Sequence, residues 1–156
     1  MTFQLISSYL IGIAGLVVGV VVGLILAAWR QGKIDTNPAV TRWDLWVTIP
    51  LLLGAIGGHI ALVPQMVQQN QVLFSLYAAA VIVAVIIGFA GFSIWRLGAV
   101  LFPLGSIVAY FYYAIPARSA DYVGLTLKVV ELAVIVAALV PFAMPERMRL
   151  GRRMVA

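Results

Sequence analysis

The chain has 156 residues, of which 64% are apolar and only 10% are charged. Soluble domains carry about a quarter charged residues, so this composition, with a mean hydropathy of +1.11, excludes an ordinary soluble fold and predicts an integral membrane protein. Cysteine is absent, which excludes disulfides, thiolate metal sites and a cysteine nucleophile. The net charge of +5 is attributed to membrane topology, and we expect no binding of nucleic acid.

Five apolar segments predict an all-α bundle of five transmembrane helices in a single domain. The first segment is long enough to cross about 30 Å of hydrocarbon, and its start lacks the basic residues of a cleaved signal peptide. The spans are expected at residues 5–29, 45–64, 72–95, 97–116 and 122–144, followed by a basic tail at 145–156.

The tract from Val72 to Pro116 decides the number of spans. It is too long for one crossing, and Trp95-Arg96-Leu97-Gly98 supplies a charge and a glycine at which the chain could reverse. Two spans in this tract also give the better charge asymmetry, because a single span would place the tail arginines opposite the first loop.

The positions of the basic residues predict the orientation of the bundle. Cytoplasmic loops are enriched in Lys and Arg, which places the N-terminus outside and the C-terminus in the cytoplasm, with the protein in the inner (plasma) membrane. One basic residue, Arg118, is then outside, and Lys128 lies within the membrane. The cytoplasmic side holds Arg30, Lys33, Arg42, Arg96, Arg147, Arg149, Arg152 and Arg153. The tryptophans fall on that side too, and we expect the six tyrosines to form a belt in the outer half.

Span one has glycines at every fourth position, Gly15, Gly19 and Gly23, which therefore share one helical face. Small residues let membrane helices approach closely. This face either packs against another helix of the same chain or forms a groove for a partner subunit.

Three ionisable residues lie within the spans. Lys128 and Glu131 are three residues apart on span five and share a face. His59 lies in span two near its outer end, and span two runs in the opposite direction. Because side chains tilt toward the N-terminus of their helix, we expect all three groups to converge in the outer half of the bilayer.

Several roles fit this cluster. A histidine and a carboxylate inside a membrane can relay protons, contact a quinone or couple protons to transport. The alternative is a structural Lys128–Glu131 pair with His59 bonded to a backbone carbonyl, or a contact to a partner subunit. A haem ligand role for His59 would need a second ligand from another chain. We expect no metal site and no cofactor bound by this chain alone.

The leading functional hypothesis is a non-catalytic accessory subunit of a larger membrane complex, such as a bacterial respiratory or photosynthetic electron-transfer complex linked to quinone. The partners would be other integral membrane subunits and membrane lipids. The rival is a small proton-coupled transporter or channel that uses His59, Lys128 and Glu131. A membrane enzyme acting on lipid or quinone is a third hypothesis, although the sequence has no recognisable catalytic motif. Anionic lipid headgroups are the expected contacts of Arg147, Arg149, Arg152 and Arg153.

Overall fold

The computed structural model describes residues 3–65, 68–117 and 122–143, and every regular element in those ranges is helical. Five segments there are long and apolar enough to cross a membrane, which confirms the predicted helical class and suits a multi-pass membrane protein. The long helices are α1 (Phe3–Arg30), α2 (Ile49–Leu62), α3 (Gln68–Phe89), α4 (Trp95–Ala117) and α5 (Tyr122–Ala143). The short ones are η1 (Gln31–Thr36, 3₁₀), η2 (Asp44–Thr48, π) and η3 (Val63–Gln65, 3₁₀), of which η2 and η3 extend α2 at its two ends.

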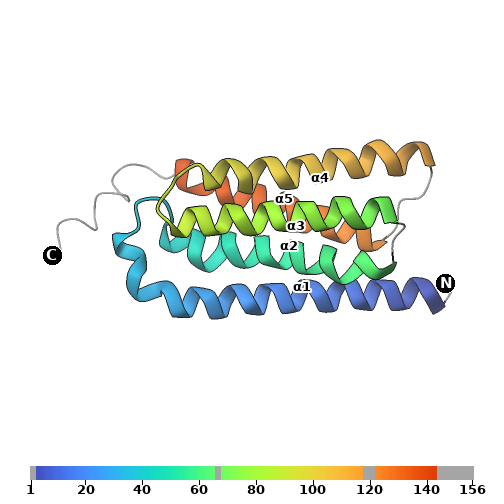
Figure 1. The fold of residues 1–156 in the computed structure, drawn as a ribbon, viewed down its shortest axis with the longest axis horizontal. Helices are drawn as coiled ribbons and strands as arrows, with labels where there is room; N and C mark the ends of the chain where they lie inside the picture. The colour runs from blue at the N-terminus through green and yellow to red at the C-terminus, as the bar shows by residue number, and fades with distance from the viewer. Residues whose placement is uncertain (1–2, 66–67, 118–121, 144–156) are drawn as a thin grey trace.

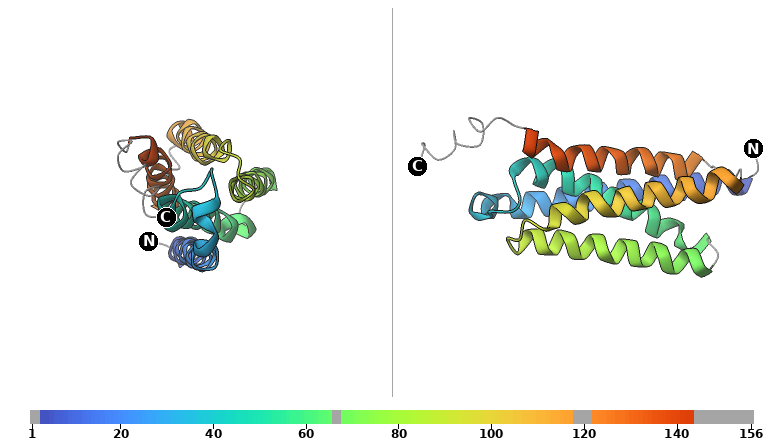
Figure 2. Two further views of the ribbon diagram at one scale, coloured as in Figure 1. Left: turned by 90° about the vertical axis from the view of Figure 1, so that its left-hand side faces the viewer. Right: turned by 90° about the horizontal axis from the view of Figure 1, so that it is seen from above.

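Four of the helices form a ring in chain order, and the fifth lies outside it. α2, α3, α4 and α5 each pack against the next, and α5 closes the ring by packing against α2. α1 lies at the edge of the bundle and makes most of its contacts with α2 (Figures 1 and 2). In their most apolar stretches, 56% of the second span is buried but only 22% of the first and 17% of the fourth. α2 is therefore the central helix.

The glycine face of α1 packs against α2 of the same chain. A Cβ added at Gly19 would lie 2.1 Å from the Leu53 carbonyl oxygen, and one at Gly15 would lie 2.3 Å from the carbonyl oxygen of Gly57. At Gly23 the neighbour is the Pro50 Cα, at 2.5 Å. The two helices are thus in backbone contact, which only glycine permits at these positions.

The reversal between α3 and α4 lies earlier than the sequence predicted. α3 ends at Phe89, and Gly91 takes a left-handed conformation with φ of 95° in the turn, a backbone geometry that favours glycine. The expected turn at Trp95-Arg96-Leu97-Gly98 is wrong, because these residues begin α4. Trp95 is 1% exposed and donates from Nε1 to the Ala39 carbonyl at 2.9 Å, so the first residue of α4 is packed inside the bundle.

The segment between η1 and η2 is folded over the turn that joins α3 to α4. The Asn37 side-chain oxygen accepts from the backbone N–H groups of Ala39 and Val40, at 2.8 and 3.0 Å. Its amide nitrogen donates to the Gly88 and Phe89 carbonyls, at 3.2 and 3.3 Å. One side chain thus shapes the loop and satisfies carbonyls at the C-terminal end of α3, which have no partner within the helix.

Gly19→Ala should destabilise the protein, because the added Cβ would force α1 away from the α2 backbone. Overpacking of this kind costs roughly 1–3 kcal/mol and should lower the thermal unfolding midpoint in detergent. Gly105→Ala is the matched control, because Gly105 is also helical and its Cβ would meet nothing within 4 Å. Equal midpoints for the two variants would contradict the close contact of α1 with α2.

Candidate functional site

The polar cluster lies inside the ring and draws side chains from all four of its helices. We define it as His59 of α2, Tyr77 of α3, Ser106 of α4, and Lys128 and Glu131 of α5. The structure thus brings together the three ionisable residues that the sequence singled out. His59 and Glu131 are 1% and 0% exposed, and Lys128 is 7% exposed.

The Lys128 ammonium is the hub of the cluster. Its Nζ donates to Glu131 Oε2 at 2.7 Å and to the Ser106 hydroxyl oxygen. It also lies 5.6 Å from the centroid of the Tyr110 ring, within the range of a cation–π contact. The charge is therefore shared between a carboxylate on its own helix and two groups on α4.

The hydrogen bonding of His59 indicates which nitrogen of its imidazole carries the hydrogen. Nδ1 lies 2.8 Å from the Ala55 carbonyl oxygen, one turn earlier on α2. A carbonyl can only accept, so Nδ1 carries a hydrogen, and in the neutral ring Nε2 presents its lone pair to the cluster. Nε2 lies 3.4 Å from Glu131 Oε1 and 3.5 Å from Lys128 Nζ. The imidazole packs against the aromatic rings of Phe74 and Tyr77, and its centroid lies 4.9 and 5.0 Å from theirs.

One oxygen of the Glu131 carboxylate is buried without a hydrogen bond. Oε2 accepts from Lys128, but among the described residues Oε1 has no donor in good hydrogen-bond geometry, and neither has the buried hydroxyl of Tyr77 an acceptor. This hydroxyl lies beside the Glu131 carboxylate, so a small movement would let its O–H donate to Glu131. A buried acceptor without a donor is costly, and a hydrogen on His59 Nε2 would supply one. The geometry therefore has a place for an added proton between His59 and Glu131.

A second buried ion pair, between Asp44 and Arg96, lies at the opposite end of the ring. Asp44 is fully buried, and its Oδ2 accepts from Arg96, from the Thr41 hydroxyl at 2.7 Å and from the Thr41 N–H at 2.8 Å. Its Oδ1 accepts from Thr48 at 3.3 Å. Arg96 also donates to the Ala138 carbonyl of α5, at 3.3 Å. Both carboxylate oxygens have donors, so this pair is satisfied in a way that Glu131 is not.

Several residues of the two buried ion-pair sites were not predicted from the sequence. Tyr77 and Tyr110 were expected in an interfacial belt, but they lie half-buried beside His59 and Lys128. Asp44 was assigned to a loop and Arg96 to a turn. Ser106 and Tyr110 are four residues apart, so they share a helical face, and this spacing of polar groups in an apolar span was the available signal.

The other predicted site residues do not join the polar cluster. Gly15, Gly19 and Gly23 contact α2 on its outer side. Arg147, Arg149, Arg152 and Arg153 lie outside the described residues.

In the described ranges there is no group of three His, Cys, Asp or Glu side chains that could hold a metal ion. For His59 as a haem ligand, Nε2 would have to face iron, but Lys128 Nζ and Glu131 Oε1 already lie within 3.5 Å of it.

Comparison with known proteins yields no relative. No family model, curated protein or solved structure matches the chain.

Lys128→Met should strongly destabilise the protein, because it leaves the Glu131 carboxylate buried without its cation. Breaking a buried ion pair in this way costs roughly 3–5 kcal/mol. The double variant Lys128→Met/Glu131→Met should recover most of the loss, since neither charge remains. The thermal unfolding midpoint in detergent measures both. Val129→Met, at a neighbouring position that is 68% exposed, is the control, and equal losses in the single and double variants would contradict the pairing.

Proposed function

We propose that the protein is a small proton-coupled transporter or channel in which the polar cluster is the protonation site. The observation that carries this proposal is the position of His59 Nε2, between the Lys128 ammonium and the unbonded Oε1 of Glu131. An imidazole ring can bind and release a proton at Nε2. Ionisable groups inside a membrane are costly, and they commonly mark ion or proton pathways.

The chemistry follows from the hydrogen bonds. With His59 neutral, the charges of Lys128 and Glu131 cancel. A proton that binds Nε2 becomes a donor to Glu131 Oε1, and the cluster gains one positive charge. The imidazolium then repels the Lys128 ammonium, which is only 3.5 Å away.

Proton uptake would change the partners of Lys128. Its remaining contacts are Glu131, the Ser106 hydroxyl and the Tyr110 ring, and the last two belong to α4. Repulsion from His59 on α2 strengthens the preference of Lys128 for α4. Protonation is thereby coupled to how α4 and α5 pack relative to α2, which is the kind of two-state element that a proton-coupled carrier requires.

Proton flux into liposomes that contain the purified protein and a trapped pH-sensitive dye tests the proposal. A membrane potential set by a potassium gradient and valinomycin should drive wild-type flux, and Glu131→Gln and His59→Asn should abolish it. The asparagine side chain keeps an N–H group that can donate to the Ala55 carbonyl, but it does not titrate. Ile60→Ala and Leu132→Ala are matched controls at neighbouring exposed positions and should retain flux. Wild-type flux equal to that of empty liposomes would overturn the channel form, and flux unchanged in both cluster variants would remove the cluster from the mechanism.

The location proposed for the protein is the inner membrane, with the N-terminus outside. Arg30, Lys33, Arg42 and Arg96 all lie at the end of the bundle where α1 ends and α4 begins. Their grouping at one end supports a cytoplasmic position for that end, by the positive-inside rule. The polar cluster is nearer the other end, with Lys128 roughly 9 Å along α5 from its first residue.

A second candidate is the accessory-subunit role in a larger, quinone-linked electron-transfer complex. The exposed aromatic group at the end of α4 favours it, since Tyr112 and Tyr113 are 72% and 69% exposed, and aromatic side chains are enriched at protein interfaces.

Copurification in mild detergent from the native membrane separates the two candidates. An accessory subunit should elute with a stoichiometric membrane partner, and Tyr112→Ala/Tyr113→Ala should release it. Leu101→Ala/Leu104→Ala, at exposed positions on the same helix, is the control. Elution of the wild-type chain alone would contradict the accessory role and leave the carrier proposal standing.

A further inference from the structure

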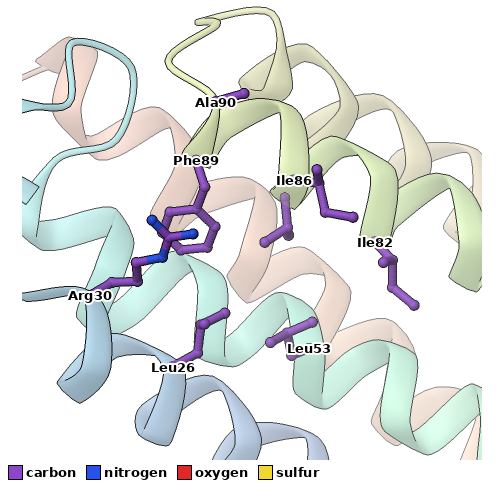
Figure 3. Close-up of a pocket in the computed structure, with 8 residues that line it drawn as sticks. Leu26, Arg30, Leu53, Ile82, Ile86, Phe89 and Ala90 are labelled. Atoms are coloured by element: carbon purple, nitrogen blue, oxygen red, sulfur yellow. The ribbon is translucent and has the colours of Figure 1, made fainter. Parts of the chain in front are cut away.

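An apolar groove lies between α1 and α3, with α2 as its floor (Figure 3). Its volume is about 450 Å³, within the range of small-molecule sites. The apolar lining comprises Leu26 of α1, Leu53 of α2, and Ile82, Val85, Ile86 and Phe89 of α3. Along α3 the lining runs from Ile82 to Phe89, which is about 10 Å of helix. Ile82 and Ile86 are 42% and 60% exposed, so the groove opens to the surface of the bundle.

Arg30 lies at one end of this otherwise apolar groove. Its guanidinium lies 5.0 Å from the centroid of the Phe89 ring and 4.9 Å from that of Trp29, and Figure 3 shows it beside the Phe89 ring. The two aromatic rings contact the guanidinium through cation–π interactions, but they do not accept hydrogen bonds from its N–H groups. Among the described residues, the buried Nε has no hydrogen-bond partner, and no carboxylate is paired with this guanidinium. The groove therefore ends in a positioned cation.

We propose that the groove binds one acyl chain of an anionic phospholipid, whose phosphate is held by Arg30. Guanidinium groups bind phosphate oxygens through paired, charge-assisted hydrogen bonds. Arg30 is the last residue of α1, so in a membrane-spanning helix it lies at headgroup depth, while the lining from Phe89 to Ile82 extends toward the hydrocarbon. The apolar walls of the groove suit the first part of an acyl chain, and the phosphate matches the cation at its end. This site involves none of the residues of the polar cluster.

Native mass spectrometry tests the proposal. The purified full chain is titrated with phosphatidylglycerol or with phosphatidylcholine that has the same acyl chains. The wild type should bind one phosphatidylglycerol about tenfold more tightly than phosphatidylcholine, because both lipids offer a phosphate to Arg30 but the quaternary ammonium of choline repels the guanidinium. Arg30→Gln should remove this preference. Ile82→Trp, which fills the groove, should weaken binding of both lipids.

Two matched variants serve as controls. Arg42→Gln removes a charge at the same end of the bundle but outside the groove lining, and Val83→Trp places the same bulky side chain on an exposed face of α3. Both should bind like the wild type. Equal wild-type affinities for the two lipids, or an equal loss in Arg30→Gln and Arg42→Gln, would overturn the proposal. Displacement of phosphatidylglycerol by millimolar inorganic phosphate would also overturn it, because it would show a simple anion site. A wild-type dimer that is lost only in Ile82→Trp would overturn it too, because it would show that a second copy of the chain fills the groove.

Discussion

Carboxylates buried in an apolar bundle need cationic partners, and this constraint shapes both ends of the ring. At one end, Asp44 precedes α2 and reaches Arg96 at the start of α4. Toward the other end, Glu131 of α5 pairs with Lys128 and faces His59 of α2. An unpaired charge inside the bundle destabilises the fold by several kcal/mol. Each ion pair therefore favours the arrangement in which its two helices lie side by side. The polar groups thus specify the arrangement of helices whose surfaces are otherwise uniformly apolar.

The two ion pairs differ in how completely they are satisfied. Both oxygens of the Asp44 carboxylate accept hydrogen bonds, and Arg96 also stacks over Trp95 and Phe142. Such a site has nothing to gain from a further ligand or proton. Among the described residues, Glu131 keeps one oxygen without a donor, next to a histidine, whose imidazole can bind and release a proton. This difference separates a structural role for the first pair from a chemical role for the second.

The number of helices and the pairing of Lys128 with Glu131 could be predicted from the sequence, because both follow from the fixed rise and the 3.6-residue repeat of an α-helix. The length of the apolar tracts fixed the number of helices, and the spacing of Lys128 and Glu131 placed them on one face. The ring itself could not be predicted in this way, because which apolar helix packs on which depends on shape rather than on pattern. The turn was misplaced for a related reason. A charged residue such as Arg96 is typical of a loop, and the linear sequence does not reveal that Asp44 is its partner inside the bundle. The left-handed conformation is taken by Gly91 rather than by Gly98.

The position of α1 explains the groove on the surface of the ring. Because Gly15, Gly19 and Gly23 allow backbone contact, α1 sits deep against the outer side of α2. In that position it lies outside the ring, although its first half also packs against α5, where Gly12 meets Val123. The same close approach draws α1 toward α2 rather than α3, which leaves the space between Leu26 and Ile86 unfilled by protein. In a bilayer an apolar space of this kind is filled by lipid, and Arg30 at its end selects for a lipid with a negative charge.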